Sequence, residues 1–280
     1  MRQVIGSLVL TVFSVTGLLS QVQFSGTIVN GNGNPIPYVN IGIPSKGIGT
    51  VSDHNGIYNI DFASPGDTVV ISVIGYEMKV IPYAIISQSP RVILKEKDYD
   101  LPVVQIKSSR IKIKPVVIGS RNKTRGHSIG FGSKQLGSEI GAQLYFEHYT
   151  EAESMHFVVN HAKGDSMHFR LKIYQILDGK IGQQVMRQAV YVREAQRKGE
   201  FSLDLQPYEL KFKGKYLVSL EWIENINGIS NQGLSFDTKS DRKNGGTYMR
   251  LSSMGKMEKV PYLNNKRPCF YIKGKAYITD

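Results

Sequence analysis

Cysteine is almost absent from this sequence, since Cys269 is the only one in 280 residues. A single cysteine excludes an internal disulfide framework and a zinc site made of several thiolates. Cys269 follows Pro268 in a stretch that reads as a late strand. We therefore expect an inert, buried or half-buried thiol there rather than a nucleophile.

Two motifs of site chemistry are missing as well. The sequence contains neither His-Glu-x-x-His, as in zinc peptidases, nor Gly-Lys-Ser/Thr, as in phosphate-binding loops. The nearest approach to a ligand set is a loose group of histidines and glutamates: His148, Glu151, Glu153, His156, His161 and His168. His156 and His168 alternate with Phe157 and Phe169, which predicts that both imidazoles face solvent. We predict no catalytic residue, no metal site and no cofactor.

Long apolar runs are absent after the N-terminus. Met1-Arg2 precedes an apolar run up to Val15, followed by small residues, which is typical of a secretory signal peptide. We expect a signal peptide over residues 1–20, cleaved after Gly17 or Ser20; an uncleaved anchor is the alternative. No later stretch reaches the about 20 apolar residues of a spanning helix. The mature chain is therefore expected to be exported, with no transmembrane segment.

Positive charge is present in excess and is unevenly distributed. The net charge is +12, but residues 22–100 hold five basic and seven acidic side chains. The excess lies in residues 101–280, with 29 basic and 16 acidic side chains. Such asymmetry suggests two units with different partners.

Residues 22–100 have the pattern of short strands separated by turns. Val22 to Val29 alternates, and further apolar segments follow at roughly ten-residue spacing up to Leu94. Turn signals such as Asn30 to Pro35 and Asp53 to Gly56 separate them. About seven strands without a helical period predict a small β-sandwich.

Four segments of this region resemble the carboxypeptidase regulatory-like (CarboxypepD_reg-like) family: Gly26–Val29, Gly33–Ile41, Gly49–Tyr58 and Ile71–Tyr76. The resemblance implies a prealbumin-like β-sandwich that is itself non-catalytic. A domain of this kind is similar to the N-terminal extension of TonB-dependent outer-membrane receptors and to an accessory domain of some metallocarboxypeptidases. It further implies an exported envelope protein of a Gram-negative bacterium.

Residues 101–141 are expected to form a basic, glycine-rich linker. From Lys107 to Lys134 there are eight basic residues, and no acid lies between Asp100 and Glu139. Such a segment attracts polyanions in a salt-dependent way. The candidate binding residues are Arg110, Lys112, Lys114, Arg121, Lys123 and Arg125. Because apolar residues occur between Ile111 and Ile118, part of the segment could instead form a strand. A solvated linker that binds no ligand is the alternative to polyanion binding.

Residues 142–280 again alternate with period two, as at Phe169 to Ile173 and Tyr216 to Trp222. This predicts a second, larger β-sandwich, with a jelly-roll-like arrangement as the economical interpretation. Trp222 shares its register with apolar neighbours and is expected in the core. Tyr174 lies in the outward register with Arg170 and Lys172, so it is the candidate face for stacking on a sugar.

The whole pattern predicts an all-β, exported, non-catalytic protein that binds or assembles with an envelope glycan, lipopolysaccharide or an outer-membrane protein. We expect it in the periplasm, at the outer-membrane surface or secreted, and after export nucleic acid is not an expected partner. Two alternatives remain: a peptidase or glycan hydrolase with its site on the C-terminal sandwich, and a structural accessory subunit of a TonB-dependent receptor or export machine.

Overall fold

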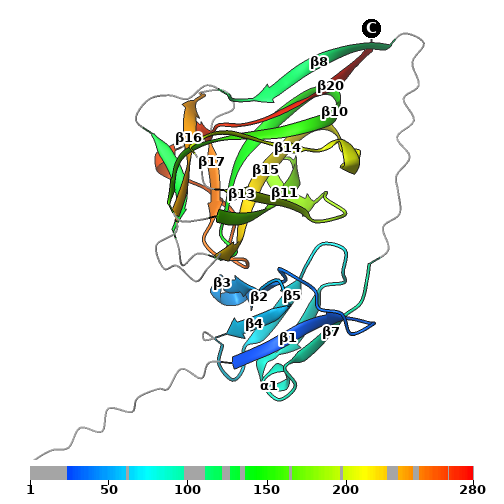
Figure 1. Ribbon diagram of the computed structural model, residues 1–280, viewed down its shortest axis with the longest axis vertical. Coiled ribbons are helices and arrows are strands. Elements are labelled where there is room, and N and C mark those ends of the chain that lie inside the picture. The colour runs from blue at the N-terminus through cyan, green and yellow to red at the C-terminus, as the bar shows by residue number, and fades with distance from the viewer. Residues whose placement is uncertain are drawn as a thin grey trace, which may run out of the picture.

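The computed structural model describes residues 24–60, 63–97, 111–121, 127–132, 136–163, 166–195, 198–225, 233–241, 246–263 and 265–279. The expected signal peptide lies outside these ranges, as do Arg110, Lys123 and Arg125 of the basic segment. The described part of the chain is almost entirely strand, arranged as a small N-terminal domain and a larger unit above it (Figure 1). The all-β expectation is therefore confirmed.

Seven strands in two sheets build the small domain. One sheet has the order β4-β1-β7 and the other the order β3-β2-β5-β6. The strands are β1 (Phe24–Asn30), β2 (Asn40–Ile43), β3 (Ile48–Val51), β4 (Ile57–Ile60), β5 (Thr68–Ser72), β6 (Lys79–Pro82) and β7 (Arg91–Leu94). A 3-10 turn, η1 (Pro44–Lys46), follows β2, and a short helix, α1 (Tyr83–Ile86), follows β6.

The core of the small domain lies between its two sheets. Ile28 and Tyr58 from one sheet and Ile41 and Ile71 from the other are almost fully buried in one apolar cluster. Because successive side chains of a strand point to opposite faces, each strand contributes alternate residues to this cluster. The seven-stranded sandwich predicted from the sequence is confirmed.

Thirteen hydrogen-bonded strands form the larger unit. They are β8 (Ile111–Gly119), β9 (Ser128–Gly132), β10 (Glu139–Lys163), β11 (Ser166–Leu177), β12 (Lys180–Gln184), β13 (Val190–Ala195), β14 (Gly199–Asp204), β15 (Lys211–Asn225), β16 (Gly233–Ser240), β17 (Thr247–Arg250), β18 (Glu258–Lys259), β19 (Lys266–Pro268) and β20 (Phe270–Thr279). Short 3-10 turns occur at η2 (Gln206–Tyr208) and η4 (Pro261–Leu263).

Strand β10 connects the two halves of this sheet. Its first part pairs with β15 and β17, its middle part with β14 and β20, and its last part with β16. Its register with β20 shifts between Ala152 and Ser154, and its register with β16 shifts between Val159 and His161. Such irregularities bend a strand and increase its twist. The sheet can therefore fold over one core that contains Phe146, Phe157 and Trp222.

Two strands lie inside the segment that the sequence analysis assigned to a linker. β8 pairs with β20 from Ile111 to Gly119, and β9 pairs with β16. The ladder with β20 holds β8 in place, and Ile118 packs on the core of the larger unit, whereas Ile113 and Val117 are exposed. β10 begins at Glu139, slightly before the predicted start of the second sandwich. No helix in the described ranges is long and apolar enough to cross a membrane.

We expect Trp222→Ala to be among the most destabilising single changes in the larger unit. Trp222 is fully buried, and its ring lies 5.6 Å from that of Phe131 and 6.0 Å from that of Phe169, between centroids. Removing such a side chain leaves a cavity and costs about 3–5 kcal/mol of unfolding free energy. Urea denaturation measures the loss, and Tyr262→Ala, at an 81% exposed position, is the control expected to change little. Equal effects of the two variants would contradict this packing.

Candidate functional site

The most concentrated polar chemistry in the described residues lies where the two parts of the chain meet. One face of the larger unit carries a row of charges across four adjacent strands. Arg170 of β11 pairs with Glu221 of β15, Glu221 with Glu139 of β10, and Glu139 with Arg250 of β17. Directly opposite residues on neighbouring strands have side chains in contact range. The register therefore brings two cations and two carboxylates into one line.

Lys172 resolves the repulsion between the two neighbouring carboxylates. Its Nζ lies 2.9 Å from Glu221 Oε1 and 3.8 Å from Glu139 Oε2. Two like charges directly opposite in a sheet are destabilising. The ammonium of Lys172 is attracted to both carboxylates and offsets their repulsion. We call these five residues the ion row: Arg170, Lys172, Arg250, Glu139 and Glu221.

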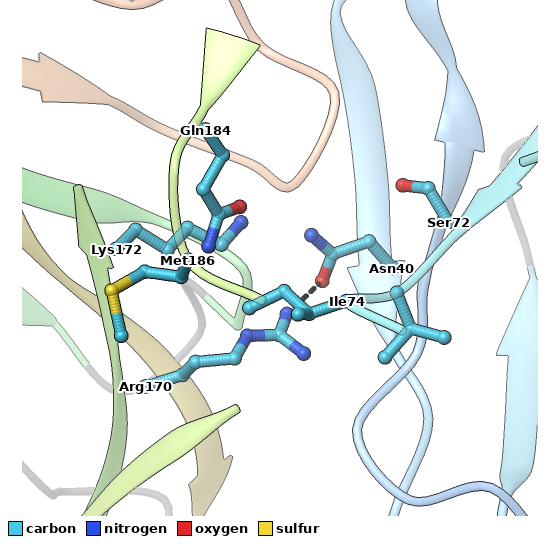
Figure 2. A pocket seen from close by; sticks show the side chains of 8 residues that line it. Asn40, Ser72, Ile74, Arg170, Lys172, Gln184 and Met186 are labelled. Atoms are coloured by element: carbon cyan, nitrogen blue, oxygen red, sulfur yellow. Dashed lines mark hydrogen bonds between the residues drawn. The ribbon is translucent and has the colours of Figure 1, made fainter. Parts of the chain in front are cut away.

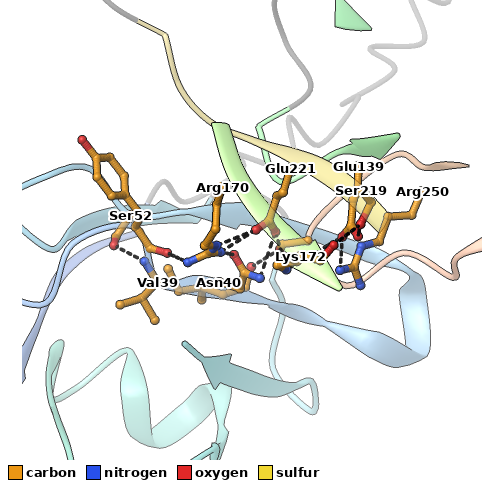
Figure 3. Close-up of polar contacts among 12 residues, drawn as sticks. Val39, Asn40, Ser52, Glu139, Arg170, Lys172, Ser219, Glu221 and Arg250 are labelled. Atoms are coloured by element: carbon orange, nitrogen blue, oxygen red, sulfur yellow. Dashed lines mark hydrogen bonds and ion pairs between the residues drawn. The ribbon is translucent and has the colours of Figure 1, made fainter. Parts of the chain in front are cut away.

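The small domain closes over one end of the ion row (Figure 3). Arg170 donates to Glu221 Oε2 from Nε at 2.8 Å and from Nη2 at 2.6 Å. The same guanidinium donates to the backbone oxygen of Tyr38 at 2.6 Å and to Asn40 Oδ1 at 2.7 Å. Asn40 in turn donates from Nδ2 to Glu221 Oε1 at 3.0 Å. One amide of the small domain thus contacts both members of the ion pair.

At the other end of the ion row, two hydroxyl groups and a guanidinium donate hydrogen bonds to Glu139. Ser219 and Arg250 donate to its two oxygens, and Tyr174 donates to Oε2 at 3.1 Å. Arg250 also donates to the Tyr174 hydroxyl at 2.7 Å. Every charged member of the ion row therefore has a partner of opposite charge. This is the condition under which charges survive in a protein interior.

Burial changes the ionisation of the ion row. Desolvation lowers the pKa of Lys172 from 10.5 to about 8, with the nearby carboxylates opposing that fall. Desolvation by itself would raise the pKa of Glu221, but Arg170, Lys172 and Arg250 lower it to about 2. Burial likewise raises the pKa of Tyr174 well above its ordinary value, so its hydroxyl keeps its proton. The ion row contains three basic and two acidic side chains, so basic side chains outnumber acidic ones by one.

A second polar contact between the two parts is centred on Glu224. His168 Nδ1 lies 2.6 Å from Glu224 Oε2, and Tyr38 donates its hydroxyl to the same oxygen at 2.8 Å. His54 Nδ1 lies 3.2 Å from Glu224 Oε1. These hydrogen bonds together lower the pKa of Glu224 against the opposing effect of its partial burial. Tyr38 also packs edge-on against Tyr191, with 5.3 Å between ring centroids.

The third contact uses the loop after β17. Ser252 donates to the backbone oxygen of Gly47 at 2.8 Å, and Ser253 donates to that of Ile41 at 3.2 Å. Gly42 and Gly49 are paired across β2 and β3. A Cβ on Gly49 would lie 2.3 Å from Ser253 Oγ, and one on Gly42 would lie 2.7 Å from Met254 Cγ. The loop approaches this closely because both positions lack a side chain.

The structure corrects several expectations about outward-facing residues. Arg170 and Lys172 are 1% and 4% exposed, because the small domain covers the polar face of β11. Tyr174 is held by Glu139 and Arg250 instead of presenting a free stacking face. His168 is half-buried against Glu224. Both faces of β11 are thus covered where one was expected in solvent.

His156 is also buried rather than solvent-facing. It stacks on Tyr271 at 4.5 Å between centroids, and its Nε2 lies 2.9 Å from Ser154 Oγ. Burial lowers its pKa, which favours the neutral imidazole. Trp222 and Cys269 are fully buried, as predicted. In the ranges that the structure describes, no group of three or more His, Cys, Asp or Glu is arranged to hold a metal ion.

The described members of the predicted polyanion site do not form one cluster. Lys112 and Lys114 are exposed on β8, opposite Ile278 and Ala276 of β20. Arg121 forms an ion pair with Glu200, at 3.1 Å. Arg110, Lys123 and Arg125 lie outside the described residues.

The sequence around the start of β9 contains a serine motif. Residues 126–130 read Gly-His-Ser-Ile-Gly, the spacing of a nucleophile elbow. In that elbow the serine sits on a sharp turn between a strand and a helix. Ser128 here begins β9 and is opposite Asp237 of β16 in an antiparallel ladder. The next described element is strand β10, so the motif lacks the structural context of a hydrolase elbow.

We expect Glu221→Gln to destabilise the protein strongly. The change leaves Arg170, Lys172 and Arg250 facing the single carboxylate of Glu139. Breaking a buried ion pair by removing one partner costs about 3–5 kcal/mol. Urea denaturation measures the loss, and Glu258→Gln, at an exposed pair with Lys256, is the matched control. A loss no larger than that of the control would contradict the role of the ion row.

The ammonium of Lys172 predicts a pH dependence of stability. Between pH 8 and 10.5 the folded protein has released this proton while the unfolded chain still holds it. The unfolded state then binds more protons, so stability increases as pH rises through this window. Relative to Lys172→Met, the wild type should gain up to about 3 kcal/mol, at 1.36 kcal/mol per pKa unit. Denaturation of both proteins across pH 7.5–10.5 tests this, and a constant difference would contradict it.

Comparison with known proteins agrees with the resemblance seen in the small domain. A TonB-dependent receptor, P39 of Formosa agariphila, is 39% identical over 71 residues, which are 25% of this chain and 7% of the receptor. The chain thus covers only a small part of that relative. Among solved structures, the cysteine protease and lectin-like domains of Cwp84 from Clostridium difficile align with a TM-score of 0.40 and 12% identity. That alignment covers 85% of this chain and 58% of the other; at these values the likeness says nothing about activity. Residues 24–106 match the CarboxypepD_reg-like domain family, which identifies the small sandwich as a domain of that family.

Proposed function

We propose that this protein is an exported, non-catalytic module of the cell envelope that assembles with an outer-membrane protein. The observation that carries the proposal is the CarboxypepD_reg-like domain, a region shared with a TonB-dependent receptor. In this interpretation residues 1–20 are removed on export, and the larger unit is the part specific to this protein.

The contacts between the two parts support a rigid module. Three contacts join the small domain to the larger unit. They are the hydrogen bond from Arg170 to the Tyr38 backbone oxygen, the one from the Tyr38 hydroxyl to Glu224, and the one from Ser252 to the Gly47 backbone oxygen. A domain held at three places presents its free faces in a fixed orientation. Fixed orientation lowers the entropic cost of binding a partner.

The partner surface that we infer is the apolar side of the small domain. Large apolar side chains are exposed on several elements of the small domain: Ile57, Met78, Val80, Ile85 and Ile93. β7 and α1, which carry Ile93 and Ile85, lie on the side away from the larger unit (Figure 1). Exposed apolar groups gathered on one domain are typical of a protein-binding surface.

Photo-crosslinking from this surface tests the proposal. A photoreactive residue at Ile93 should crosslink to an outer-membrane protein in intact cells, whereas one at Leu177 should not. Leu177 is the matched control because it is 58% exposed, against 54% for Ile93, and lies on the larger unit. Ile93→Glu should reduce capture from a probe at Val80 at least tenfold without lowering the melting temperature. Equal crosslinking from Ile93 and Leu177, or an unchanged yield in Ile93→Glu, would contradict the proposal.

Polyanion binding through β8 is the second candidate, favoured by the exposure of Lys112 and Lys114 on this strand, which pairs with β20. Phosphate contacts of this kind weaken steeply with salt. Lipopolysaccharide binding that falls with salt, and falls further in Lys112→Gln/Lys114→Gln, would favour it. Binding that is indifferent to both would dismiss it.

A further inference from the structure

A cavity of about 170 Å³ opens where the small domain meets the face of the larger unit (Figure 2). The small domain contributes Asn40, Ser72 and Ile74 to its wall. The larger unit contributes Arg170 and Lys172 of β11, together with Gln184 and Met186 at and after the end of β12. Drug-sized ligand pockets span about 300–1,000 Å³. This cavity is smaller, so it fits a ligand, or the end of one, with only a few heavy atoms.

The charge around the cavity is unbalanced in one direction. The ion row contributes three cations and two carboxylates, and both carboxylates are fully buried. Two cations line the cavity, Arg170 and Lys172. The Arg170 guanidinium already donates to Glu221, Tyr38 and Asn40, so Lys172 is the cation with donor capacity left for a ligand. Burying an uncompensated charge is costly. An anion in the cavity would bring the group to neutrality.

Two hydrogen-bond donors in the cavity wall lack a full set of acceptors within the protein. The Lys172 ammonium has three N–H groups, and Glu221 and Glu139 engage at most two. The amide nitrogen of Gln184 is buried without a hydrogen-bond partner. In the close-up, the ends of the Gln184 and Lys172 side chains lie on the same side of the cavity (Figure 2). Two such donors match the two oxygens of a carboxylate.

The remaining wall is apolar. Ile74 packs against the core of the larger unit, and Met186 is almost fully buried beside it. A methionine thioether and an isoleucine offer dispersion contacts but no hydrogen bond. The wall thus favours a short hydrocarbon chain next to the charged end.

We propose that this cavity binds a carboxylate on a short aliphatic chain. Lys172 is the counter-ion, the Gln184 amide is the second donor, and Ile74 and Met186 contact the chain. The carboxylate belongs either to a free acid or to a glutamate side chain of a peptide. Binding of this carboxylate requires no outer-membrane partner. Because both parts of the chain line the cavity, its ligand also strengthens the joint between them.

Titration calorimetry of the full-length mature protein tests the site with sodium butyrate as probe. Butyramide, which has the same shape without charge, should not bind, and inorganic phosphate should bind at least tenfold more weakly than butyrate. N-acetylglutamate amide represents a glutamate side chain of a peptide. A higher affinity for this compound than for butyrate identifies a peptide as the source of the carboxylate, and a higher affinity for butyrate identifies a free acid. Binding of neither acid, or equal binding of butyramide, would overturn the proposal.

Two variants on β12 separate the site from general effects. Gln184→Leu removes the second donor and should weaken butyrate about tenfold, the equivalent of roughly 1.4 kcal/mol. Gln183→Leu changes the exposed neighbouring residue and should leave affinity unchanged. Lys172→Met should abolish binding, and its melting temperature shows whether it remains folded. Equal affinities for the Gln184→Leu and Gln183→Leu proteins would overturn the assignment even where Lys172→Met fails to fold.

Discussion

The joint between the two parts of this protein depends on the buried pair of Arg170 and Glu221. Neither side chain reaches solvent, so each lost its hydration on folding and needs a complete set of partners. The larger unit alone supplies only part of that set. The small domain supplies the rest through the backbone oxygen of Tyr38 and the amide of Asn40. Hydrogen bonds at a guanidinium have fixed directions, so this contact specifies orientation as well as attachment.

Strand β10 imposes the second constraint, because it supplies Glu139 to the ion row and also runs through the core of the larger unit. Its first residues stand between β15 and β17, where Glu139 is opposite both Glu221 and Arg250. Its later residues carry Met155 and Phe157 into the apolar interior. The charge arrangement at the interface is therefore tied to the register of the core. A slip of one residue would turn every side chain to the other face.

Period-two alternation predicted much of this architecture. It placed Phe169, Leu171 and Trp222 on an inward face, and all three are buried. It also placed Arg170 and Lys172 on the opposite face of β11, and the register of the strand confirms this. Alternation does not reveal what covers the second face, because the covering residues Tyr38 and Asn40 lie about 130 positions earlier. Arginine and lysine placed opposite glutamates on neighbouring strands are the signal that could have indicated the covered face. That signal needs the pairing of β15 with β11 and with β10, which cannot be read from one sequence. The same limit applies to β8, whose place beside β20 depends on a strand at the other end of the chain.

Several of the acceptors at this joint are main-chain oxygens, namely those of Tyr38, Ile41 and Gly47. A carbonyl oxygen keeps its position whichever side chain its residue carries, provided that the strand keeps its path. The side chains at these three positions can therefore change while the hydrogen bonds from Arg170, Ser252 and Ser253 remain. Side chains matter at the other contacts. Tyr38, Asn40 and His54 contact the larger unit through their own polar groups. Gly42 and Gly49 allow the close approach of the loop because they have no side chain. The chain thus leaves its outward faces free to acquire new specificities without loosening its own assembly.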